Sequence, residues 1–228
     1  EYQDGGETSI RGGKLRLSSS NLGAQKVEFN AEIHVDGASL KVGRPMSEIK
    51  GKVLLQIEDT AGQPPMFSLD GTFDSMVVYN QTIEAVDVAM HLEHGDLLTL
   101  SELSGNIYGG ELFGIAEYDF GKSKTWSVQL QIADAALGQF ITSPSLDESE
   151  EREPAAGRVY ASVNLEGSID RPDRIGAGRL RIYDGSFKTL PVSVGIYQLF
   201  QLSSPIVSPP EFLDVVWNLE NEDIALES

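Results

Sequence analysis

Apolar and polar residues alternate along most of this chain, the pattern of β-strands that have one apolar face and one face in water. The clearest alternating runs cover 27–35, 49–58, 86–93, 126–132 and 159–166. Strands of this kind are typical of an antiparallel sheet. Between the runs stand pairs of turn-forming residues, which are Asp36-Gly37, Ala61-Gly62, Asp70-Gly71, Gly95-Asp96 and Gly121-Lys122. The spacing therefore predicts an antiparallel meander of ten or more strands.

Two glycine-rich units in the second half of the chain predict tight turns. In Leu103–Gly114, two apolar segments flank Gly109-Gly110, and in Gly176–Phe187 they flank Asp184-Gly185. Gly-Gly and Asp-Gly suit hairpin turns whose central residues need a positive φ. We therefore expect a positive φ at Gly110 and at Gly185.

Helical spacing occurs in only two short stretches. Asp134 is placed to cap a short helix that carries Leu137, Phe140 and Ile141. Pro191 suits the first turn of a second helix. The apolar stripe of that second helix would consist of Val192, Ile196, Leu199 and Phe200. We expect both helices to cap an end or an open side of the sheet.

The segment 143–157 is acidic and nearly free of apolar residues, which predicts a mobile surface loop. It could separate two domains, but the same alternating pattern resumes after it. We therefore interpret residues 1–228 as a single β domain with a long acidic loop. Glu1 and Ser228 both look like cuts, so we expect a fragment of a longer chain.

Charge and composition exclude several functions. The chain has 17 basic and 35 acidic side chains, a net charge of −18. Such an excess of acid disfavours nucleic acid as a partner, because phosphate contacts need clusters of Lys and Arg. The chain has no cysteine, which rules out disulfides and thiol nucleophiles. No apolar run approaches the ~20 residues that span a membrane as a helix.

The residues offer little for catalysis or for metal binding. His91 and His94 are three residues apart in a strand and would point to opposite faces, so we expect no metal site. No nucleophile elbow, dinucleotide loop or phosphate-binding loop is present. The acids Glu102, Glu111, Glu117 and Asp119 are weak candidates for a glycosidase pair and suit a solvated strand face better. We expect a protein that is not an enzyme and needs no cofactor.

The residues from 98 to 228 resemble the C-terminal region of AsmA-like proteins. The similarity lies in Leu103–Gly114 followed by Trp126–Ile132 and Ala133–Leu137, and again in Leu165–Ile169 followed by Gly176–Phe187 and Leu190-Pro191. Residues 27–97 carry the resemblance more weakly. Its motifs are mainly turn glycines, which other β-meanders share.

The resemblance implies a location and a role. AsmA-like proteins belong to the Gram-negative cell envelope, where an N-terminal helix tethers them to the inner membrane. They are grouped with bridge-like lipid transfer proteins, and they carry no catalytic motif. By this resemblance we expect a periplasmic module for outer-membrane biogenesis, tethered by a segment outside this sequence. Its expected partners are lipid acyl chains, other envelope proteins or further segments of the same chain.

A strongly twisted, curved sheet with one apolar face would form a groove whose floor shelters acyl chains, which need buried area and no specific hydrogen bonds. The alternative is a structural or interaction module, such as a stalk or adhesin segment, whose apolar faces are fully buried as in a sandwich. The candidate floor residues are Phe29, Ile33, Val53, Leu55, Ile57, Val88, Met90, Leu92, Val128, Leu130, Val163 and Leu180.

Limited proteolysis tests the predicted loop. Between Pro144 and Ala156, Leu146 is the only large apolar residue that could anchor the segment to a sheet. We expect the first cleavage by a nonspecific protease to fall inside this stretch, with the flanking fragments staying associated. Protection of the same stretch in hydrogen exchange would contradict the prediction.

Overall fold

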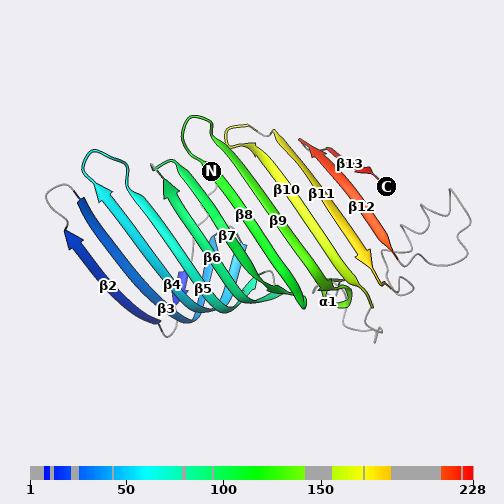
Figure 1. The fold of residues 1–228 in the computed structure, drawn as a ribbon, viewed down its shortest axis with the longest axis horizontal. Helices are drawn as coiled ribbons and strands as arrows, with labels where there is room; N and C mark the ends of the chain where they lie inside the picture. The colour runs from blue at the N-terminus through cyan, green and yellow to red at the C-terminus, as the bar shows by residue number, and fades with distance from the viewer. Residues whose placement is uncertain are drawn as a thin grey trace, which may run out of the picture.

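The protein is an all-β structure built around one curved antiparallel sheet (Figure 1). The computed structural model describes residues 8–10, 13–21, 26–42, 44–78, 81–93, 95–141, 156–171, 173–185, 212–221 and 223–227. Within this part of the chain, 13 strands pair in the order β1-β3-β4-β5-β6-β7-β8-β9-β10-β11-β12-β13, and β2 also pairs with β3. The predicted meander is confirmed, because almost every strand pairs with the strand before it and the strand after it.

The strands are longest at β3 and β4, with 17 residues each, and become shorter toward the C-terminus. Their bounds are β1 Thr8–Ile10, β2 Gly13–Asn21, β3 Lys26–Val42, β4 Arg44–Thr60, β5 Met66–Val78, β6 Gln81–Glu93, β7 Leu97–Ile107, β8 Gly110–Asp119, β9 Thr125–Ala136, β10 Arg158–Ser168, β11 Arg174–Tyr183, β12 Leu213–Glu220 and β13 Asp223–Glu227. In the described part of the chain, one short helix, α1 Leu137–Ile141, follows β9. Because the apolar alternation continues through strand after strand, the chain forms a sheet of unusual width.

The hairpin between β7 and β8 is as tight as predicted, but its turn lies one residue earlier. Ile107 pairs with Gly110, so the two central residues are Tyr108 and Gly109. Their φ values are 54° and 70°. Both central residues of a type I′ turn need a positive φ. The prediction of a positive φ at Gly110 was therefore wrong, and at the second unit the positive φ falls on Asp184, at 53°.

Two predicted turns are in fact parts of strands. Asp36-Gly37 lies within β3, where Gly37 has a φ of 95° and the register with β4 shifts. Asp70-Gly71 lies in the middle of β5, and Gly71 pairs with Val53 and Val88. Glycine marks bulges and close approaches inside strands as well as turns. The dipeptide alone does not distinguish these uses.

The helix predicted near residue 137 is confirmed as α1, but Asp134 does not cap it. Asp134 lies three residues before the helix, near the C-terminal end of strand β9, and has a φ of 56°. Its carboxylate accepts a hydrogen bond of 2.7 Å from the Tyr183 hydroxyl. The backbone N–H of Leu137 instead donates to the carbonyl of Gly157, at 3.0 Å. The side chain of Asp134 thus ties β9 to β11.

Four bulges bend the sheet along one line. They lie at Gly37 in β3, Glu48 in β4, Ala85 in β6 and Asp134 in β9, each with a positive φ. A bulge adds one residue to one strand of a pair and increases bend and twist. One row of cross-strand partners runs within two residues of all four, through Asp36, Lys50, Ser75, Glu84, Asn106, Glu111 and Ala133. In Figure 1 the lower ends of β3 to β6 accordingly turn behind the rest of the sheet.

The most buried side chains follow the same line. Val86, Ala135 and Val159 are fully buried, and Val159 pairs with both Ala135 and Ile182. Leu137 of α1 packs onto this group. The buried apolar residues along the bend are Ala38, Ile49, Val86, Ile107, Ala135, Val159 and Ile182. The core of the described structure is therefore a narrow band inside the bend and does not fill the space over the sheet.

Three sequence predictions lie mainly outside the described residues. They are most of the acidic loop 143–157, the helix after Pro191 and the strand after Asp184-Gly185. They stay predictions.

Gly110 tests the tight packing of the β7–β8 turn against β9. A Cβ atom at Gly110 would lie 2.4 Å from the carbonyl oxygen of Ala133 and 2.5 Å from the backbone nitrogen of Ala135. We expect Gly110→Ala to lower the free energy of unfolding by at least about 2 kcal/mol, because backbone atoms must move. Urea denaturation measures the change.

Gly109→Asn is the matched control. The nearest described neighbour of a Cβ at Gly109 is 3.8 Å away, and asparagine tolerates a positive φ. We expect this substitution to cost less than about 1 kcal/mol. If both variants lost the same free energy of unfolding, the tight packing of Gly110 against β9 would not be the cause.

Candidate functional site

The candidate site is the apolar face of the sheet, onto which the register brings all twelve predicted floor residues. Residues that pair directly in an antiparallel sheet point to the same face. Phe29 pairs with Ile57, and Leu130 pairs with Val163. The remaining predicted residues join this face through further pairs, which involve Ile33, Val53, Leu55, Val88, Met90, Leu92, Val128 and Leu180.

Two unbroken apolar rows cross the whole sheet on this face. The first apolar row consists of Leu17, Ala31, Leu55, Leu69, Met90, Leu100, Ala116, Val128, Leu165, Gly176, Leu219 and Ile224. The second apolar row consists of Leu15, Ile33, Val53, Gly71, Val88, Leu103, Gly114, Leu130, Val163, Gly178, Trp217 and Leu226. Neither row contains a polar side chain between its two ends.

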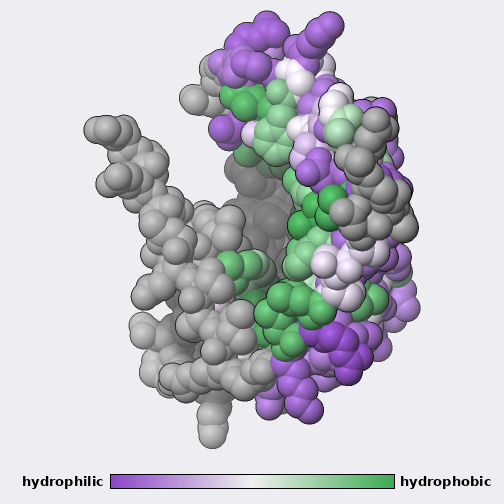
Figure 2. All heavy atoms as spheres, turned by 90° about the vertical axis from the view of Figure 1, so that its left-hand side faces the viewer, coloured by the Kyte–Doolittle hydropathy of each residue, from purple (hydrophilic) through white to green (hydrophobic). Residues whose placement is uncertain are grey.

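The opposite face has the reverse character. The row beside the first apolar row consists of Ser18, Asn30, Gln56, Ser68, His91, Thr99, Glu117, Ser127, Glu166, Ile175, Glu220 and Asp223. Eleven of these twelve side chains are polar or charged, and Ile175 is the exception. Figure 2 shows the result as a hollow lined by hydrophobic residues inside a largely hydrophilic outer surface.

The apolar face is less buried than the interior of a closed sandwich. In the two apolar rows only Ala31, Gly71, Gly114 and Gly178 are buried, and none of these has a large side chain. Leu130, near the middle of the second row, is 37% exposed. Inward-facing residues between two packed sheets interdigitate and lose nearly all contact with solvent. Among the described residues, no second sheet covers these rows.

Glycines on the apolar face let large side chains lie flat on the sheet. A Cβ at Gly178 would lie 2.1 Å from the indole of Trp217, and a Cβ at Gly114 would lie 2.7 Å from Leu130. Each large side chain therefore covers the backbone of its glycine partner. This arrangement keeps the floor of the face smooth and widens the hollow above it.

Sequence reasoning missed several residues of the two rows. Leu69 was overlooked because Gly71 was interpreted as part of a turn, which hid strand β5. Trp217 and Leu219 follow a proline-rich stretch, and no alternation was noted there. Their own alternation with Asn218 and Glu220 is the signal that would have found them.

The polar face is electrostatically uneven. Between Val53 and Gly121 the sequence holds twelve acidic residues and no lysine or arginine. Basic residues lie instead toward the two ends of the sheet. Near the C-terminal end, Arg179 donates two hydrogen bonds to the carboxylate of Asp214, and Arg181 donates a third at 3.1 Å. These bonds hold the pKa of Asp214 down at about 2, with the contribution of Arg179 the largest.

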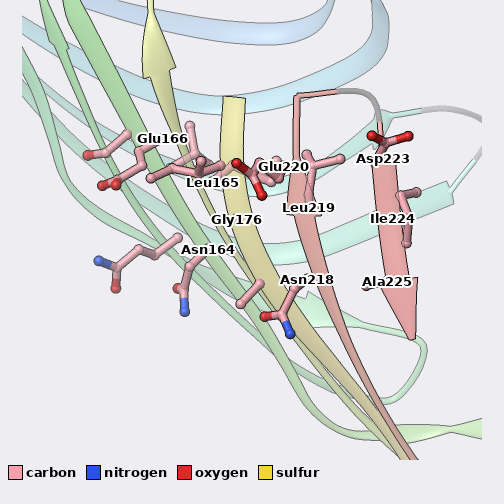
Figure 3. A pocket seen from close by; sticks show the side chains of 15 residues that line it. Asn164, Leu165, Glu166, Gly176, Asn218, Leu219, Glu220, Asp223, Ile224 and Ala225 are labelled. Carbon is pink, nitrogen blue, oxygen red and sulfur yellow. The ribbon is translucent and has the colours of Figure 1, made fainter. Parts of the chain in front are cut away.

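A recess of about 630 Å³ crosses the C-terminal strands β9 to β13. Figure 3 shows it as a shallow hollow in which Glu166, Glu220 and Asp223 lie along one side and the amides of Asn164 and Asn218 along the other. The apolar residues between these two sides are the last members of the first apolar row, namely Val128, Leu165, Gly176, Leu219 and Ile224. Three carboxylates make this end of the sheet acidic.

The described residues contain no cluster of His, Asp or Glu that could hold a metal ion. In the same part of the chain, no helix is long and apolar enough to cross a membrane. The arrangement offers apolar area bordered by charge. Comparisons with family models, curated proteins and solved structures found no match for this chain.

The Asp214 cluster predicts a pH dependence of stability. A carboxylate whose pKa is lower in the folded than in the unfolded protein stabilises the fold above its unfolded pKa, and this stabilisation is lost as the pH falls through the folded value. Since the pKa of Asp214 is about 2, the gain is lost between roughly pH 4 and pH 2. We expect Asp214→Asn to destabilise the protein at pH 7 and to approach the wild type near pH 2.

Urea denaturation at several pH values measures this difference. Asp223→Asn removes an exposed carboxylate from the neighbouring strand β13 and serves as the control. We expect it to change stability by less than about 0.5 kcal/mol at either pH. A difference between wild type and Asp214→Asn that stays constant down to pH 2 would rule out the ion cluster as its cause.

Proposed function

We propose that this protein is a non-enzymatic module that shelters or moves lipid acyl chains along its apolar face. The observation that carries the proposal is the pair of apolar rows, which run from one edge of the sheet to the other without a large buried side chain. A face of this size would expose far more contiguous apolar surface than a monomer normally shows. Such a surface needs an apolar occupant.

Acyl chains match the dimensions and the chemistry of the two rows. Twelve strands spaced about 4.8 Å apart make each row roughly 50 Å long. Burying a methylene group stabilises a complex by about 0.8 kcal/mol, so ten or so methylene groups supply about 8 kcal/mol. Apart from the indole N–H of Trp217, the side chains of the rows have no hydrogen-bonding group, which suits a ligand that has none to satisfy. Lipid tails of different lengths would fit equally well.

The resemblance to AsmA-like proteins supports the same function. That family is associated with lipid transfer between the membranes of the Gram-negative envelope, and it has no catalytic motif. On this basis we propose a place in the periplasm and a role in outer-membrane biogenesis. Further segments of the same chain or other envelope proteins would extend the path.

One observation favours a second candidate, a structural or interaction module. Both apolar rows end on edge strands, and their last residues are strongly exposed, Leu15 at 61%, Ile224 at 66% and Leu226 at 72%. Edge strands with unpaired backbone groups can pair with another chain. In this function, the apolar face would be covered by protein and would take up no lipid.

Substitutions on the two faces of the sheet distinguish these functions. Leu130→Asn places an amide in the middle of the second apolar row, where an acyl chain would have to desolvate it. We expect the affinity for a fluorescent long-chain fatty acid or phospholipid to fall by at least about tenfold, since an unsatisfied amide costs roughly 1–3 kcal/mol. Because Leu130 is 37% exposed, the protein should stay folded.

Ile115→Asn is the matched control on the opposite face. Ile115 lies on the neighbouring strand β8, pairs with Gln129, and is 46% exposed. We expect this variant to bind lipid like the wild type. Delipidated wild-type protein without saturable lipid uptake would refute lipid binding and favour the structural module. A Leu130→Asn variant that unfolds would indicate a covered face.

A further inference from the structure

The two ends of the apolar face differ in charge, and the β2 end carries the features of a site for an anionic headgroup. Among the described strands, β2 lies at an edge of the sheet, and its residues Lys14, Leu15, Arg16 and Leu17 alternate between the two faces. Leu15 and Leu17 are the first members of the two apolar rows and are 61% and 55% exposed. The side chain of Arg16 is 84% exposed on the polar face. One edge strand thus presents leucines to one side and cations to the other.

The cations of β2 belong to a larger basic cluster. Lys14 pairs directly with His34, and His34 pairs with Lys52. Arg16 and Lys50 flank this row on neighbouring positions of the same face. The register thus brings Lys14 and Lys52 to the two sides of His34, and an anion would stabilise two lysines gathered on one face. The recess lined by this cluster is about 1200 Å³ and also borders Asp36 and Asp74.

Glu32 shows how the cluster holds an anionic oxygen. Its carboxylate lies 3.0 Å from Lys52, 2.9 Å from His34 and 3.7 Å from Arg16. These contacts lower the pKa of Glu32, with the hydrogen bond from Lys52 contributing most. No described carboxylate lies within ion-pair distance of Lys14 or Lys50. The recess therefore carries four lysine and arginine side chains against three carboxylates, in a protein whose net charge is −18.

At the opposite end of the sheet, Arg179 and Arg181 share the carboxylate of Asp214 and lie on β11, two strands in from β13. There the rows end at Ile224 and Leu226 of β13, beside the carboxylates of Glu166, Glu220 and Asp223. Three neighbouring carboxylates repel the negative charge of a phosphate group. Between the two ends, the polar face of β5 to β8 contains acids and no lysine or arginine.

We propose that the β2 edge is the port at which a phosphate-bearing anionic lipid meets this protein, its headgroup on the basic cluster and its acyl chains on Leu15 and Leu17. This inference rests on the proposed function and names its substrate class and its entry point. The lipid is favoured over free phosphate because the cations and the exposed leucines lie on consecutive residues of one strand. A lipid that enters here would then slide its tails along the two apolar rows toward β13.

The test compares lipid classes and charge reversals in the whole chain. The uptake of an acyl-labelled phosphatidylglycerol, supplied without vesicles, is compared with the uptake of a phosphatidylcholine that has the same acyl chains. We expect the wild type to prefer the anionic lipid, and Lys14→Glu with Arg16→Glu to reduce its affinity on the order of tenfold while leaving phosphatidylcholine uptake unchanged. The preference should also weaken at high salt.

Arg171→Glu with Arg174→Glu makes the same change of net charge at the far end of the sheet and should alter neither affinity by more than about twofold. Equal uptake of the two lipids by the wild type would overturn the port but keep the proposed function, whereas uptake of neither lipid would overturn both. Inorganic phosphate that binds the cluster as tightly as the anionic lipid would overturn the assignment to a lipid. If both double variants lost the same affinity for the anionic lipid, net charge alone would explain the effect and the port would be overturned.

Discussion

Antiparallel register is the constraint on which the rest of this structure depends. Side chains alternate faces along a strand, so one residue of slippage between two strands would move every apolar side chain of one of them into water. The pairing of Leu55 with Ala31 and Leu69, repeated through every later strand, keeps the two apolar rows on one face. The width of the sheet, the apolar rows and the segregation of charge all follow from that repeated pairing.

The bulges turn this flat arrangement into a hollow one. At Glu48, Ala85 and Asp134 a residue other than glycine adopts a positive φ, which costs free energy. Packing of Val86, Ala135 and Val159 inside the bend offsets that cost, because these are the fully buried side chains of the sheet. The bend also divides the molecule into a compact band and an apolar face that stays half exposed. Stability and ligand binding would thus depend on different residues of the same strands.

The two ends of the hollow differ in charge. Lys14 and Arg16 at one edge and Glu220 and Asp223 at the other lie on the same polar face, and strands β5 to β9 between them carry acids and no lysine or arginine. An apolar face alone treats all lipid tails alike, because hydrophobic burial depends on area and has no orientation. Electrostatic differences between the ends provide the discrimination between headgroups that the floor of the sheet lacks.

The sequence by itself determined the fold class and the face on which each predicted floor residue lies, because a period of two is a local property that survives in any sheet built from these strands. Phe29, Val88 and Leu130 could be assigned to one surface for this reason. Only the tertiary structure decided which strands pair, and hence that Lys14, His34 and Lys52 meet across three strands. It also decided that Gly37 and Gly71 lie within strands and that the bulges align. Turn dipeptides and isolated cations carry no information about partners distant in sequence, and those partners determine where a glycine bends the chain and where like charges gather.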